Sequence, residues 1–210
     1  MKFPFFASFI VFCLWLTHQL RKAKKLQLNS EKNYWEKEAL ANSTRRKPLN
    51  SLNYIQIPLE QFSFENLTPN STVNDAKELL QNLSGQKIVN LTGFTNTDLK
   101  LKYGAPNISL LTEYDQNYTL LVRTLQTLAE EYYRQGFEDD AQKVLEFAIS
   151  TGTDVSQSYF LLADLYEKKG ALDKVEKLAR KAASVPSILK NSIVHTLQES
   201  GPHSDLLRSL

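Results

Sequence analysis

The sequence predicts a mainly α-helical protein, in which an N-terminal transmembrane helix precedes a short α-solenoid of two helical hairpins with capping helices. Two observations lead to this prediction. The Leu-Ala pair, the tyrosine and the glycine found over 128–136 recur with the same spacing over 162–170. Residues 3–16 are uncharged and almost wholly apolar, and residues 17–20 extend them without a charge. The composition, with 42% hydrophobic and 23% charged residues, is typical of one or two ordinary globular domains.

The N-terminal segment has the length and polarity of a membrane anchor. A helix over Phe3–Leu20 would be about 27 Å long, which matches the hydrocarbon core of a bilayer. Only Lys2 precedes the apolar run and no small-residue cleavage site follows it, so an uncleaved anchor is favoured over a secretory signal. We therefore predict a single-pass anchor over residues 1–20.

A basic segment follows the anchor directly. Four Lys or Arg residues lie between positions 21 and 25, and residues 19–47 have a net charge of +6. The positive-inside rule then predicts an N-terminus outside and a body in the cytoplasm. Residues 21–47 are expected to form a basic juxtamembrane stalk, with a helix over 31–41 that either stands alone or continues the anchor. From residue 48 onward the net charge is −5, which argues against nucleic acid as the partner of the body.

Glycosylation motifs support an alternative. The Asn-x-Ser/Thr motif occurs seven times, which would suit a structural glycoprotein of the lumen or the cell exterior. Because charge placement is the stronger physical cue, we favour the cytoplasmic interpretation. The seven asparagines are Asn42, Asn66, Asn70, Asn82, Asn90, Asn107 and Asn117.

The chain lacks the residue patterns of a catalytic or metal site. Cys13 is the only cysteine, so no internal disulfide forms, and no Cys/His metal-ligand set is present. The three histidines lie at the membrane edge (His18), on the final helix (His195) and in the tail (His203), where no carboxylate is expected to orient them as bases. No phosphate-binding loop or nucleophile elbow occurs. We therefore expect no enzymatic activity, no cofactor and no metal.

Residues 48–118 are expected to form an irregular cap of short elements at the first end of the solenoid. The pattern predicts strand-like pieces over 52–59 and 87–91, and short helices over 75–83, 97–103 and 106–113. Within 87–107, Asp98, Lys100, Lys102 and Tyr103 offer the elements of a small-molecule site. A purely structural role for this block is favoured.

A helical period begins near residue 116 and produces two similar copies over 122–155 and 156–189 within a region of 119–199. Each copy reads as two helices joined at a glycine. A final helix over 188–199 would close the second end, and residues 200–210 are expected to be a tail. The positions predicted to pack the repeats are Leu128, Ala129, Tyr132, Gly136, Ala141, Ala148, Leu162, Ala163, Tyr166, Gly170 and Ala182.

These two copies resemble tetratricopeptide repeats, and the whole layout is similar to small membrane-anchored proteins of that family. The Leu-Ala pair, the tyrosine, the glycine and the final alanine match the family spacing. Both copies depart from the family pattern at its leading tryptophan, where this chain has Leu125 and Tyr159. The resemblance implies a scaffold that binds protein or peptide partners in a concave face.

The same resemblance implies which residues line that face, because each first helix contributes its exposed positions. Acidic side chains among them favour a basic partner, and two aromatic rings offer apolar anchors. The predicted partner-binding residues are Arg123, Gln126, Glu130, Tyr133, Arg134, Gln157, Phe160, Asp164, Glu167 and Lys168.

Overall fold

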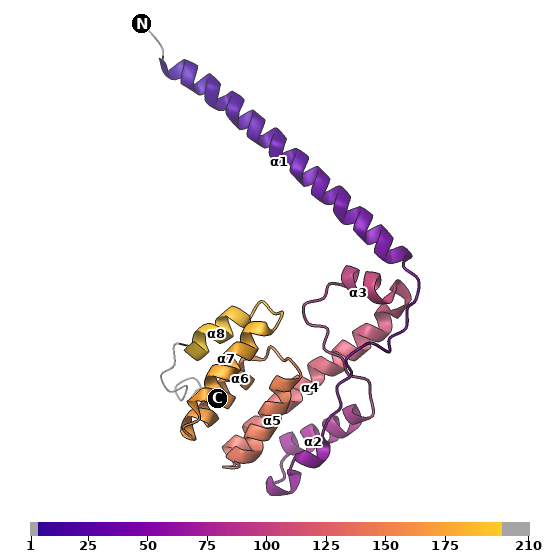
Figure 1. The fold of residues 1–210 in the computed structure, drawn as a ribbon, viewed down its shortest axis with the longest axis vertical. Coiled ribbons are helices and arrows are strands. Elements are labelled where there is room, and N and C mark those ends of the chain that lie inside the picture. Colours follow the sequence, from indigo (N-terminus) through magenta and orange to yellow (C-terminus); the bar gives the residue numbers. More distant parts are fainter. Residues whose placement is uncertain (1–3, 199–210) are drawn as a thin grey trace. The chain divides into compact units, whose positions relative to one another are not determined.

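The computed structural model describes residues 4–198, and over these residues the chain is mainly α-helical, without a named strand. The chain divides into two compact units (Figure 1). The first contains the chain up to Pro48 and Thr95–Ile108, and the second contains Leu49–Phe94 and the chain from Ser109 onward. The α-helices are α1 (Pro4–Ser43), α2 (Ser71–Ser84), α3 (Asn96–Tyr103), α4 (Ile108–Arg134), α5 (Glu138–Ser150), α6 (Ser156–Lys168), α7 (Leu172–Ser184) and α8 (Lys190–Gln198).

The first unit is built on α1, a single helix of 40 residues that joins the expected anchor and stalk without a break. No helix within residues 4–198 is both long enough and apolar enough to cross a membrane. Side chains from Ser8 to Leu20 are exposed on all sides of α1, except for Cys13, which is half-buried.

Helix α3 packs against the C-terminal part of α1. Lys37 Nζ lies 2.8 Å from Asp98 Oδ1, and Lys100 Nζ pairs with Glu38. The pKa of Asp98 falls to about 2, because of the hydrogen bond from Lys37 and then those from Thr95. Helix α3 begins at a capping box between Thr95 and Asp98, so its cap lies earlier than the predicted start at residue 97.

Gly104 ends α3 and lies against the backbone that follows α1. Its φ is +94°, and a Cβ there would collide with the backbone of Arg45. The expected cap over 48–118 is therefore divided, because Thr95–Ile108 belongs with α1 while the rest belongs with the helical hairpins.

The second unit begins at Leu49 with a segment that has little regular secondary structure. Tyr54 and Val89 form an isolated antiparallel bridge, so the two strand-like pieces predicted from the sequence meet at a single point. Two short 3-10 helices follow, η1 (Leu59–Gln61) and η2 (Phe64–Asn66). Helix α2 begins earlier than predicted because the side chain of Asn70 caps it, accepting a hydrogen bond of 2.8 Å from the backbone N–H of Val73.

Helix α4 corrects the sequence-based boundaries. The helix predicted over 106–113 and the one predicted from 116 are one continuous helix of 27 residues. Pro106 lies before it, in the 3-10 turn η3 (Ala105–Asn107), and no proline or glycine interrupts Ile108–Arg134. Without such a residue the chain has no local reason to leave the helix.

The helix ends repeat at the period of the sequence. Helices α5 and α7 begin at residues 138 and 172 and end at 150 and 184, and α4 and α6 end at 134 and 168, so every pair differs by 34. Helix α5 packs on α6, α6 on α7 and α7 on α8. The predicted packing residues other than the two glycines are all buried. The predicted final helix is α8, and residues 199–210, including the expected tail, lie outside the described residues.

Both hairpins turn in the same way. The backbone N–H of Phe137 donates to the carbonyl of Tyr132 at 2.9 Å, and that of Ala171 donates to Tyr166 at 2.8 Å. Gly136 and Gly170 lie between these groups with φ of +85° and +69°. This is the Schellman closure of a helix, which requires a left-handed residue at the glycine position.

We predict that Gly136→Ala and Gly170→Ala each lower the free energy of unfolding by about 1–2 kcal/mol, which is the cost of the left-handed backbone for a residue with a Cβ. A Cβ at either glycine meets no atom within 4 Å, so steric clash adds nothing. Urea denaturation followed by circular dichroism measures the loss.

Gly85→Ala is the matched control, because Gly85 also ends a helix but has φ of −86°. This change should alter stability by less than about 0.5 kcal/mol. Equal losses at all three glycines would contradict the role assigned to the turns.

Candidate partner-binding face

The residues predicted to bind a partner lie on α4 and α6, the first helices of the two hairpins, and together they are called the first-helix face. Arg123, Arg134, Gln157 and Lys168 are exposed, Glu130, Tyr133, Phe160 and Glu167 are half-buried, and Gln126 and Asp164 are buried. The two buried members bind other residues of the same chain, as their hydrogen bonds show.

Asp164 joins α4 to α6. The Tyr133 hydroxyl donates to Asp164 Oδ2 at 3.0 Å, and Lys168 Nζ lies 3.2 Å from the same oxygen. Lys168 also lies over the ring of Tyr133, 4.5 Å from its centroid. Desolvation lowers the pKa of Lys168, but the hydrogen bonds with Tyr133 and Asp164 outweigh it and raise the pKa above its ordinary value. Asp164, one of the three acidic residues expected to attract a basic partner beside Glu130 and Glu167, is thus already paired within the protein.

Gln126 forms the second tie between the same helices. Ser158 Oγ donates to Gln126 Oε1 at 2.6 Å, and Gln126 Nε2 donates to Glu130 Oε1 at 2.6 Å. Because Gln126 and Ser158 are both buried, the hydrogen bond between them joins α4 to α6 and is not accessible to a ligand.

Arg123 and Gln157 are the two members of the first-helix face whose side chains are free to contact a partner. Both are exposed, and neither side chain has a polar partner within residues 4–198. They line a recess of about 490 Å³. We call it the Arg123 recess; its other lining residues are Thr92, Asp115, Tyr118, Thr119, Val122, Asp154, Val155, Ser156 and Leu189.

Two carboxylates of this recess, Asp115 and Asp154, were not among the residues predicted from the sequence. Burial raises the pKa of Asp115, although the backbone N–H of Leu91 donates to it at 3.2 Å. Asp154 accepts a hydrogen bond of 2.7 Å from Ser187. Treating α4 as one helix would have found Asp115, because its position is two intervals of four before Arg123 and therefore lies on the same side of the helix.

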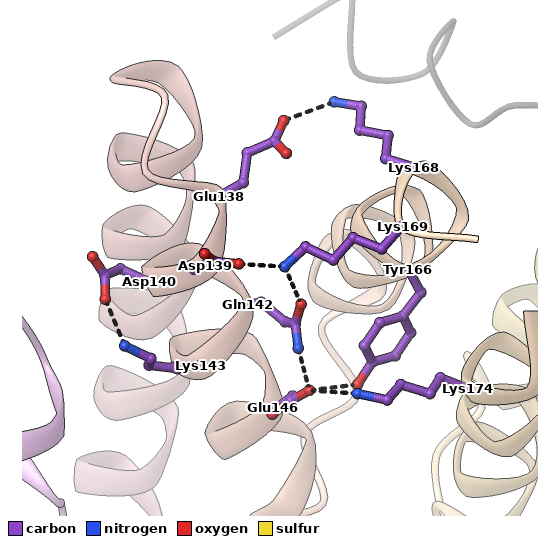
Figure 2. A network of polar contacts seen from close by, with 10 residues as sticks. All are labelled: Glu138, Asp139, Asp140, Gln142, Lys143, Glu146, Tyr166, Lys168, Lys169 and Lys174. Carbon is purple, nitrogen blue, oxygen red and sulfur yellow. Dashed lines mark hydrogen bonds and ion pairs between the residues drawn. The ribbon is translucent and has the colours of Figure 1, made fainter. Parts of the chain in front are cut away.

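A second set of polar contacts joins the hairpins at their turns (Figure 2). Lys169 of the second turn reaches back to Asp139 at 2.5 Å and to Gln142 at 2.6 Å. Glu146 of α5 accepts hydrogen bonds from Gln142 at 2.7 Å and from the Tyr166 hydroxyl at 2.9 Å. These contacts connect the first hairpin to the second. Gln142, Glu146 and Lys169 have no identical counterpart in the other copy, whereas Asp139 and Tyr166 do.

The residues considered for chemistry are dispersed. Asp98 and Lys100 bind α1 rather than line a pocket. His18 lies on α1 and His195 on α8, while His203 lies outside the described residues. Within residues 4–198, no group of three or more His, Cys, Asp or Glu side chains is placed to hold a metal ion.

Comparison of the chain with models of protein families, with curated proteins and with solved structures gave no match in any of the three.

The two repeated tyrosines, Tyr132 and Tyr166, differ in the hydrogen bonding of their hydroxyl groups. Tyr132 is fully buried and its hydroxyl has no hydrogen-bond partner within the described chain, whereas the equivalent Tyr166 donates to Glu146. Tyr132→Phe should therefore leave stability unchanged or raise it. Tyr166→Phe should lower it by about 1 kcal/mol.

Urea denaturation of the two variants beside the parent chain measures both effects. Because the two changes remove the same atom from equivalent positions, each variant is the control for the other. A loss of stability in Tyr132→Phe equal to that in Tyr166→Phe would contradict the assignment.

Proposed function

We propose that this chain is a membrane-tethered adaptor of the tetratricopeptide-repeat type, whose first-helix face binds a protein or peptide partner. The observation that carries the proposal is the repetition between the two hairpins, both in their helix ends and in the hydrogen bonds of their glycine turns. Repeated hairpins of this kind present a surface built from equivalent positions, which is typical of interaction scaffolds.

The chemistry of the partner follows from the groups left available on this face. Since Asp164 is paired with Lys168 and Arg134 with Glu131, little net charge remains to select a basic partner. Arg123 and Gln157 offer polar contacts at the Arg123 recess. A partner with an apolar side chain flanked by hydrogen-bonding groups fits this arrangement better than the basic partner expected from the sequence.

The membrane part of the proposal rests on the segment 1–20, with the body in the cytoplasm and the N-terminus outside. Phe9, Val11, Leu14 and Trp15 are each more than half exposed on α1. A helix that is apolar on all sides is stable only where its surroundings are apolar. The basic cluster that follows would contact anionic headgroups.

The alternative is a structural glycoprotein of the lumen or the cell exterior. It is disfavoured because two of the asparagine nitrogens that would carry a glycan already donate hydrogen bonds within the protein. A glycan would attach to the side-chain nitrogen of each motif asparagine. Asn107 is 2% exposed, and its nitrogen donates to the carbonyls of Lys47 and Tyr103, both at 2.8 Å. Asn90 donates in the same way to the carbonyls of Thr151 and Gly152. A glycan at either nitrogen would have to displace these bonds.

A photo-crosslinking experiment tests the partner-binding proposal. Benzoylphenylalanine placed at Arg123 or Gln157 of the full-length chain in cells should yield a discrete crosslinked protein. The same group at Glu78, an exposed position on α2, is the matched control and should not yield it. The same crosslinked species at all three positions, or none at the first two, would overturn the proposal.

Alkaline carbonate extraction with glycosidase treatment tests the tether. The parent chain should stay in the membrane fraction and show no mobility shift, because its body does not meet the glycosylation machinery. Phe9→Glu with Val11→Glu should release it. Leu26→Glu with Leu28→Glu, two exposed positions further along α1, is the control and should not. A glycosidase-sensitive shift would favour the lumenal alternative.

A further inference from the structure

A cleft of about 360 Å³ lies between α5, α6 and α7, away from the first-helix face. Its floor is apolar and consists of Ile149, Leu162 and Leu178, all of them buried. Tyr166 adds its ring to this floor, with its hydroxyl bound to Glu146 (Figure 2).

Three lysines of α7 line one side of this cleft: Lys174, Lys177 and Lys181. Only weak contacts hold them. Lys174 lies 4.0 Å from Glu146 and 5.1 Å from the centroid of the Tyr166 ring. Lys177 pairs with Asp173 on the exposed helix surface, and Lys181 has no ion pair within the described residues. Exposed pairs of this kind contribute little, so the lysines are available to another carboxylate. We call this site the lysine cleft.

The corresponding surface of the first hairpin is already covered by this chain. The positions equivalent to Tyr166, Lys174, Leu178 and Lys181 in the first copy are Tyr132, Asp140, Val144 and Phe147. On that surface, Phe62 is buried against Phe147, with ring centroids 5.9 Å apart. Asn66 donates to Asp140 at 2.9 Å, and Ser63 donates to the other oxygen of Asp140 at 3.3 Å.

Residues 62–66, which include η2, thus place one aromatic ring and two hydrogen-bond donors on this surface. In the second hairpin the acceptor Asp140 is replaced by the donor Lys174, and Phe147 by Lys181. The complementary segment for this surface therefore carries acceptors in place of donors. Carboxylates are the side chains that meet this requirement at lysines.

We propose that the lysine cleft binds an acidic peptide segment of a partner protein, with one apolar side chain on the cleft floor and carboxylates at the three lysines. The segment would cover the second hairpin as residues 62–66 cover the first. This interaction is separate from the one proposed for the first-helix face and does not depend on it.

A peptide derived from the chain tests the proposal. The probe has the sequence of residues 58–69 with Ser63→Asp and Asn66→Glu, and its binding to the full-length chain in detergent is followed by fluorescence anisotropy. The unaltered peptide should bind at least about tenfold more weakly, because the two differ only in the added carboxylates. The probe with Phe62→Ala should also bind more weakly, because the apolar anchor is lost.

Substitutions in the protein locate the binding. Lys174→Gln with Lys181→Gln should weaken the acidic probe about tenfold. Arg180→Gln with Lys190→Gln removes the same charge from exposed positions outside the cleft and should leave binding unchanged. Gln and Lys have similar helix propensities, so both variants should fold, which circular dichroism checks.

Two results would overturn the proposal: an acidic probe that does not bind, or binding that the two pairs of substitutions weaken equally. Arg123→Ala should leave probe binding unchanged while abolishing the species that is crosslinked from benzoylphenylalanine at position 157. Failure at the lysine cleft is therefore distinguishable from failure of the first-helix face.

Discussion

The arrangement of the second unit depends on the backbone hydrogen bonds that end α4 and α6. Each bond runs from the residue after a left-handed glycine back to the carbonyl of a buried tyrosine. It sets the direction in which the next helix leaves, and it does so twice with the same geometry. Because Tyr132 and Tyr166 are also buried packing residues, the turn and the core constrain each other. The two turns therefore repeat the same backbone geometry.

Polar side chains then decide how much of this surface is free. Tyr133, Asp164 and Lys168 bind one another across α4 and α6, and Gln126 binds Ser158. These bonds hold the two first helices together and occupy groups that a partner would otherwise contact. Buried polar groups that lack partners are costly, so such ties are satisfied within the protein before any ligand arrives. What remains for recognition is a smaller and more neutral set of side chains.

Local pattern was enough to predict the repeat, whereas contacts between distant segments were not predictable. The period, the two glycines and the packing alanines follow from spacing along one chain, and the helices lie where that spacing puts them. The pairing of Tyr133 with Asp164 depends on the relative rotation of two helices. The pairing of Glu38 with Lys100 joins residues 62 positions apart. Neither has a local signal, and the second is one of several contacts that join α3 to α1.

The two hairpins are more alike in their buried side chains than in their surface charges. Some buried positions are identical in both hairpins, as in Ala129 and Ala163 or Ala148 and Ala182, because a change of volume there would disturb close packing. Asp140 and Lys174 occupy equivalent positions with opposite charge. Asp140 faces donors from residues 62–66, while Lys174 lines an open cleft. Surface charge in each hairpin thus suits what it faces. Asp140 accepts hydrogen bonds from residues 62–66, and Lys174 is placed for the acidic partner segment that we propose for the lysine cleft.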